Sequence, residues 1–122
     1  MDRYPDLSQL ESFFHTVSVS EYSGAADEWH YNIRRFEFSS GGERLVCRFA
    51  PADGAIAFNF SVGGEARWDI ALVGLSSLDV EMSAGRLLLL GRVKTAELEQ
   101  LFKLAVSPRV TFSLGSTEAL AP

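Results

Sequence analysis

Residues 45–73 read LVCRFAPADGAIAFNFSVGGEARWDIALV, and the order of apolar and polar residues in this stretch decides the fold. Every second residue is apolar on either side of the turn sequence at 51–54. The alternating apolar residues are Leu45, Cys47, Phe49, Ile56, Phe58, Phe60 and Val62. A period of two predicts two β-strands that each bury one face, joined as an antiparallel hairpin.

The apolar faces of the two strands also predict their register. If the turn pairs Phe49 with Ile56, then Cys47 lies opposite Phe58, and the apolar residues of both strands share one face. A slip of one residue would turn one of these faces to solvent, so we expect the in-phase register.

The next hairpin admits two loop lengths. A three-residue Gly-Gly-Glu loop pairs Val62 with Ala66 and Phe60 with Trp68, whereas a two-residue loop pairs Phe60 with Arg67. The longer loop keeps apolar residues in phase, and its glycines supply the positive φ that short loops need. We therefore expect the three-residue loop.

The segment before this stretch changes phase. Its alternating residues are Trp29, Tyr31 and Ile33 on one phase and Phe36 and Phe38 on the other. Because a phase change inside one strand needs an extra residue, we predict a β-bulge at Arg34-Arg35.

Further strands follow residue 73. Leu78, Val80 and Met82 alternate, an Ala84-Gly85 turn follows, and Leu87 to Leu90 are apolar on both phases. A strand without a polar face is normally covered on both sides, and we expect a helix to cover the second side. A last short strand is expected around Phe112.

Two segments have helical periodicity. The first contains Leu7, Leu10, Phe13 and Phe14, preceded by Asp6 and Gln9 at capping-box spacing. The second begins at Thr95 and ends at Ser107-Pro108, because the residue before a proline disfavours the helical region. Its apolar stripe is Leu98, Leu101, Phe102 and Ala105.

These elements predict one α+β domain spanning residues 1–122, with a loose tail at 116–122. The expected architecture is a curved antiparallel meander of six to seven strands with an N-terminal and a C-terminal helix. A small closed β-barrel with helices is the alternative.

Composition limits the classes of function. The formal net charge of −5 disfavours nucleic acid as a partner, and the single cysteine allows no internal disulfide. The sequence shows neither a membrane span nor a signal-peptide core, so we expect a cytoplasmic protein.

Motifs that carry chemistry are sparse. The Gly41-Gly42 and Gly63-Gly64 pairs fit turns, Cys47 falls on an apolar phase, and Asp79 and Glu81 share one face of a strand. We expect no catalytic residues, no metal ligands and no cofactor.

Arginines form the candidate interaction surface. Arg44 and Arg48 share a polar strand face, and Arg34 and Arg35 lie at the predicted bulge. With Trp29 and Tyr31, they have the composition of a protein-binding hot spot. The alternative is that these arginines only form cross-strand ion pairs, and that the two aromatic residues lie in the core.

Residues 68–81 read WDIALVGLSSLDVE, a strand, a glycine and a second strand. This pattern resembles the small, acidic, β-rich immunity proteins of bacterial polymorphic toxin systems. The resemblance implies a cytosolic, non-catalytic protein that binds a toxin domain, often a basic one, and it assigns no binding residue.

The leading hypothesis is therefore a non-enzymatic protein-binding module, either an immunity or an adaptor protein. One alternative is a small-ligand binder or enzyme with a pocket between sheet and helix, lined by Trp29, Phe58, Trp68 and Arg48. A second alternative is an obligate homodimer joined through an apolar sheet face or edge.

Overall fold

The computed structural model describes residues 4–16, 19–20, 33–107 and 109–116. Its elements are α1 (Leu7–Phe14), β1 (Val19–Ser20), β2 (Arg34–Ser40), β3 (Glu43–Ala50), η2 (Pro51–Asp53), β4 (Ala55–Val62), β5 (Glu65–Val73), β6 (Leu75–Ser83), β7 (Arg86–Lys94), β8 (Glu99–Ala105) and β9 (Thr111–Ser116). The first five strands form one antiparallel sheet and the last four form another, each in sequence order.

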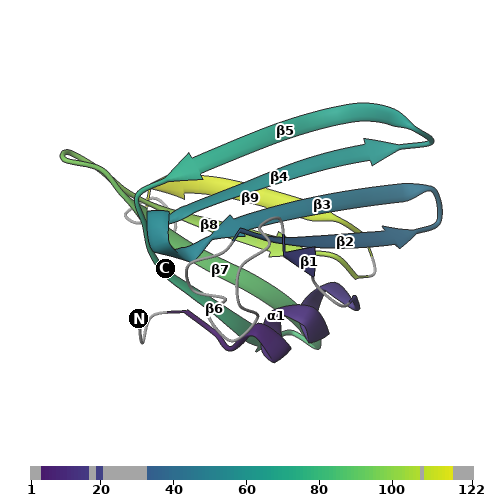
Figure 1. Cartoon of the computed structure of the whole chain (residues 1–122), viewed down its shortest axis with the longest axis horizontal. Coiled ribbons are helices and arrows are strands. Elements are labelled where there is room, and N and C mark those ends of the chain that lie inside the picture. The colour runs from purple at the N-terminus through teal and green to yellow at the C-terminus, as the bar shows by residue number, and fades with distance from the viewer. Residues whose placement is uncertain (1–3, 17–18, 21–32, 108, 117–122) are drawn as a thin grey trace.

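The two sheets lie as layers, and the hydrophobic core fills the space between them (Figure 1). Aromatic rings from both sheets meet in this core: the ring centroids of Phe58 on β4 and Phe102 on β8 are 5.5 Å apart. Helix α1 packs against β2 and β6, and its Phe14 stacks on Phe36 with centroids 5.2 Å apart. The helix and both sheets therefore share one core.

Helix α1 confirms the first predicted helix. Gln9 Oε1 accepts a hydrogen bond from the Asp6 backbone N–H at 2.8 Å, as the capping box requires. Leu10, Phe13 and Phe14 are at most 1% exposed. The helix ends at His15, whose left-handed backbone (φ 57°) holds its side chain at the helix C-terminus.

The first hairpin has the predicted register, with Phe49 opposite Ile56 and Cys47 opposite Phe58. In the second hairpin Phe60 lies opposite Trp68, as predicted, but Val62 pairs with Glu65 instead of Ala66. The loop is therefore the two-residue Gly-Gly turn, and the register shifts beside Phe60. A bulge after the turn restores the apolar phase that a longer loop was expected to preserve.

The bulge predicted at Arg34-Arg35 is wrong. Strand β2 begins at Arg34 and pairs with β3 without a register shift up to Ser40. Ile33 precedes the strand, so the described strand contains only one apolar phase. Trp29 and Tyr31, which carried the other phase, lie outside the described residues.

The second predicted helix is also wrong, because residues 99–105 form β8. Phe102 and Leu104 alternate on the core face, while Leu101 and Lys103 face outward and pair with Arg92 and Leu90 of β7. A short apolar run fits both periods, and pairing with strands on both sides selects the extended form. Thr95, expected to begin the helix, instead closes the β7–β8 turn: its hydroxyl accepts a hydrogen bond from the Leu98 N–H at 3.2 Å.

The single curved sheet with two helices is therefore corrected to two sheets and one α-helix within the described residues. The sheets pack face to face without closing into the barrel considered as the alternative. The meander order is confirmed within each sheet. In the leucine run, Leu89 is 0% exposed, but Leu88 and Leu90 on the outer face are only half-buried, so the expected helical cover is absent from the described residues.

The absence of a side chain at Gly91 leaves room in the core for the Phe102 ring. The two residues lie opposite each other on β7 and β8, and a Cβ on Gly91 would lie 2.0 Å from Phe102 Cε2. The ring therefore packs directly over the glycine backbone.

Gly74 forms the corner where the chain leaves one sheet and enters the other. Its φ of +83° favours glycine, and a Cβ there would lie 2.6 Å from the Lys94 carbonyl oxygen. The Lys94 N–H donates to Gly74 O at 2.8 Å, and the Leu75 N–H donates to Gly54 O at 2.9 Å. The Tyr4 hydroxyl donates to Leu75 O at 3.0 Å. These bonds tie the corner to both sheets.

We expect Gly74→Ala to lower the free energy of unfolding by about 2–5 kcal/mol. Left-handed strain and the displaced Lys94 backbone both contribute to this loss. Gly64→Ala is the matched control, because Gly64 has the same φ of +83° but a Cβ added to it would meet nothing within 4 Å. The control should lose only about 1–2 kcal/mol in urea unfolding. Equal losses for the two variants would contradict the steric role of the corner.

Cys47 lies inside the core at 1% exposure, as its apolar phase predicted. Burial raises the pKa of this thiol above its usual value, because the low-dielectric core disfavours the thiolate. The folded protein therefore keeps the thiol proton at a pH where the unfolded chain loses it. The stability linked to this proton is complete below the unfolded pKa of about 8.5 and declines as pH rises above it.

Between pH 9 and 10 we expect the free energy of unfolding to fall by about 1 kcal/mol because of Cys47. Cys47→Ala should remove this contribution to the slope, as measured by urea unfolding at several pH values. Burial also raises the pKa of Tyr4, whose unfolded value is about 10, so the pH range stops there. An unchanged slope in Cys47→Ala would refute the assignment.

Candidate functional site

Three of the four predicted arginines share one surface. Arg35 on β2 lies directly opposite Arg48 on β3, and Arg44 lies further along the same outward phase of β3. Arg34 instead pairs with the core residue Phe49, which places it on the opposite phase at the start of β2. Arg35, Arg44 and Arg48 are called the arginine surface below.

Glu37 lies within this surface. Arg44 Nε donates to Glu37 Oε2 at 2.7 Å, Arg44 Nη2 also contacts this oxygen, and Arg35 Nη2 lies 3.6 Å from it. These side chains are 35–51% exposed, so solvent weakens the ion pairs to about 1 kcal/mol or less each. The cross-strand pairing considered as the alternative therefore occurs at Glu37, where the Arg35 and Arg44 guanidinium groups share one carboxylate.

Two further carboxylates of the first sheet form hydrogen bonds with groups other than these arginines. Asp69 accepts a hydrogen bond from Asn59 Nδ2 at 2.6 Å, and Glu43 accepts one from the Val110 N–H at 3.4 Å. On the outward phases of β2 and β3, three arginines accompany one acidic residue, Glu37, on a chain whose net charge is −5.

Small apolar side chains border the arginine surface. Arg48 pairs with Ala57, which pairs with Ala71, and Ala50 pairs with Ala55 in the adjoining row. These residues line a shallow depression of about 220 Å³ together with Ile33, Ile56, Leu72 and Val73. The surface therefore joins guanidinium groups to an apolar floor, a combination found in protein interfaces.

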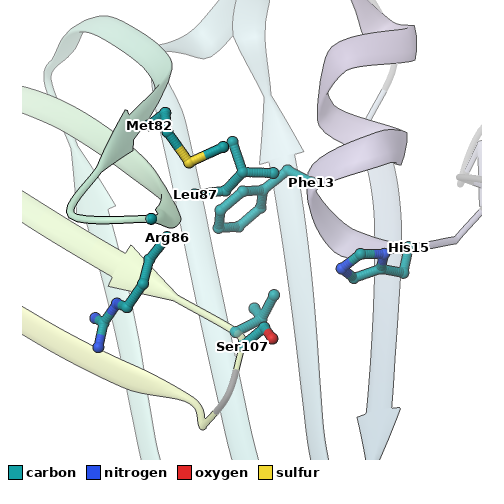
Figure 2. Close-up of a pocket in the computed structure, with 8 residues that line it drawn as sticks. Phe13, His15, Met82, Arg86, Leu87 and Ser107 are labelled. Carbon is teal, nitrogen blue, oxygen red and sulfur yellow. The ribbon is translucent and has the colours of Figure 1, made fainter.

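A second site lies at the end of α1, and the sequence analysis did not identify it. Figure 2 shows this cavity of about 300 Å³ between the helix end, the β6–β7 hairpin and the segment that follows β8. It is lined by Phe13, His15, Met82, Gly85, Arg86, Leu87, Val106 and Ser107. It is called the helix-end pocket below.

The one sequence signal for this pocket is the apolar phase of β6, which runs on through Met82. Leu78 is 0% exposed, whereas Met82 on the same phase is 66% exposed. The strand therefore keeps an apolar face beyond the point where the core covers it. Sequence periodicity cannot show where that cover ends.

The sheet–helix pocket expected for a ligand binder is not formed by its predicted residues. Phe58 is 0% exposed in the core, and Trp68 packs against Phe112 with ring centroids 5.6 Å apart. Arg48 lies on the outward phase of the same sheet, so the sheet separates it from both aromatic residues. Trp29 lies outside the described residues.

Asp79 and Glu81 share the outer phase of β6, as predicted, beside Leu90 and Arg92. Arg92 Nη1 lies 3.1 Å from Glu99 Oε1, so its charge is already paired. Among the described residues, His, Cys, Asp and Glu nowhere gather in a group of three that could hold a metal ion. Within the same residues, no helix is long and apolar enough to cross a membrane.

Comparison with known proteins gives a fold-level result. No protein-family model matches the chain, and no curated protein matches it in sequence. Its structure is similar to a chain in the contact-dependent growth inhibition toxin–immunity protein complex from Klebsiella pneumoniae 342. The TM-score is 0.79 at 17% sequence identity, and the match covers 94% of this chain and 96% of the other. The resemblance to immunity proteins inferred from residues 68–81 is thus confirmed at the level of the fold.

Proposed function

We propose that this chain is a cytoplasmic, non-enzymatic immunity-like protein that binds a toxin domain. The observation that carries the proposal is the fold shared over nearly the whole of both chains with a chain from a toxin–immunity protein complex. Fold alone does not define function, so the surface chemistry of this chain has to support the same role.

Two features of the surface support protein binding. The arginine surface offers planar guanidinium groups, which form paired hydrogen bonds with carboxylates, next to an alanine-lined depression. Val73 at the rim of that depression is 70% exposed, the largest value among the exposed large hydrophobic residues of the described chain. Arginines beside exposed apolar area are typical of interface anchors.

Charge would act in recognition at two distances, through the net charge at long range and through the arginine surface at contact. The net charge of −5 would attract a basic domain from a distance, as the resemblance to immunity proteins implies. At contact, the arginine surface would select an acidic element of that domain. Trp29 and Tyr31 remain part of the proposed surface on sequence grounds.

The direct test is neutralisation of a toxin. Each polypeptide encoded by the two genes that flank this one would be expressed from an inducible plasmid, with and without this chain. We expect one of them to arrest growth alone and to become harmless, and to copurify as a complex, when this chain is present. Growth arrest by this chain alone would overturn the proposal, as would failure to neutralise either flanking polypeptide.

The arginine surface is tested with Arg44→Ala/Arg48→Ala. We expect the Kd for the neutralised polypeptide to rise at least about tenfold, equivalent to about 1.4 kcal/mol, as measured by calorimetry. Arg92→Ala/Lys103→Ala is the matched control, because it removes the same charge from the outer face of the other sheet. Equal effects of both double variants would reduce the arginine surface to a general charge effect, and an unchanged Kd would exclude it from the interface.

A further inference from the structure

The outer face of the second sheet carries leucines that remain partly open to solvent. Leu88 and Leu90 on β7 and Leu101 on β8 point away from the core and are half-buried. They alternate along their strands with Leu89 and Phe102, which are 0% exposed in the core. Leu101 is a diagonal neighbour of Leu90, because it lies two residues from the residue opposite Leu90 on β8. These three outward leucines are called the leucine patch below.

The register of the second sheet places opposite charges on the two sides of this patch. Asp79 on β6 and Lys103 on β8 both lie directly opposite Leu90, one on each side of it. Since neighbouring strands are about 4.8 Å apart, about 10 Å of sheet separates the two charged residues. Neither forms an ion pair with any residue that the structure describes. One row across three strands therefore reads acid, leucine, base.

A row in this order is complementary to a second copy of itself. In sheets that pack face to face, the strands of the two sheets lie within about 30° of each other. A twofold axis along β7 at Leu90 would place Asp79 against the partner's Lys103, and Lys103 against the partner's Asp79. The leucine patches of the two copies would meet between these ion pairs. Arg92 lies near the same axis, but its Nη1 is already 3.1 Å from Glu99 Oε1.

The mixed charge of this row also distinguishes a second copy from a basic partner. A basic domain would be attracted to Asp79, and to Glu81 beside it, but repelled by Lys103. A second copy supplies an acid for the base and a base for the acid by symmetry alone. The Lys103 side chain is long enough to span much of the distance of about 10 Å between packed sheets.

We infer that the outer face of the second sheet binds a second copy of this chain and forms a symmetric dimer around Leu90. Strands β6 and β7 have nine residues each, so this four-stranded face measures about 14 by 30 Å. Such an area is at the small end for stable interfaces, and we expect a Kd in the micromolar range. The arginine surface, on the outer face of the other sheet, stays open to another partner.

Two variants with opposite charge changes test the dimer. Asp79→Lys leaves basic residues on both sides of Leu90, and Lys103→Asp leaves acidic residues on both sides. Either variant alone would bring like charges together across the interface. An equimolar mixture of the two restores both ion pairs between unlike chains, so dimerisation of the mixture also shows that both variants fold.

In sedimentation equilibrium we expect each single variant to raise the Kd of the dimer at least about tenfold, and the mixture to restore it. The double variant Asp79→Lys/Lys103→Asp keeps the net charge at −5 and should dimerise like the unmodified chain. Glu65→Lys is the matched control, because Glu65 is exposed on β5, an edge strand of the other sheet. It makes the same charge change and should leave the Kd unchanged.

Three results would overturn the inference: an unmodified chain that is monomeric at about 500 μM, a mixture that stays monomeric, or equal effects of Asp79→Lys and Glu65→Lys. If the unmodified chain is monomeric and deletion of residues 117–122 lets it dimerise, the tail covers the leucine patch, and the inference is overturned as well. The dimer is measured without any toxin, so it does not rest on the proposed function. Asp79→Lys should still neutralise a flanking polypeptide if the immunity role is correct.

Discussion

The corner at Gly74 is the constraint on which the rest of the structure depends. The nine strands that the structure describes, joined mainly by short turns, would continue as one sheet, but here the chain bends from β5 into β6 and begins a second layer. The bend needs a residue that tolerates positive φ and leaves room for the Lys94 carbonyl oxygen, and glycine meets both conditions. Because of this bend, Phe58 and Phe102 face each other across the core, and the outer faces of both sheets point away from it.

The two outer faces differ because different types of residue occupy the outward positions of the strands in each sheet. On β3 and β4 the outward residues include Arg44, Arg48 and a row of alanines, which makes a cationic surface beside a shallow apolar floor. At the end of α1 the inward phase of the second sheet runs beyond the core and leaves Met82 exposed. The arginine surface therefore combines exposed apolar area with positive charge on an acidic protein, and it suits a partner with acidic and apolar side chains.

The candidate site was predictable where it followed from strand phase. Arg44 and Arg48 were placed on one face by sequence, and the register added Arg35 as the direct neighbour of Arg48. The predicted position of Arg34 on this surface was wrong. Pairing with β3 sets where β2 begins, and the alternation of neighbouring residues in the sequence gives no information on that pairing. The helix-end pocket was missed because His15, Met82 and Ser107 lie on three segments far apart in the chain, and no local pattern relates them.

The sequence by itself determined helix α1, the turn at 51–54, the hairpin order within each sheet and the register of the β3–β4 hairpin, because each depends on neighbours within a few residues. Only the tertiary structure decided that residues 99–105 form a strand. Their apolar run suits a helix or a strand equally, and hydrogen bonding to β7 and β9 on either side favours the strand. The division into two layers was decided in the same way. A glycine after a strand is compatible with many turns, and only the approach of Lys94 and Gly54 from distant parts of the chain makes Gly74 a corner between sheets.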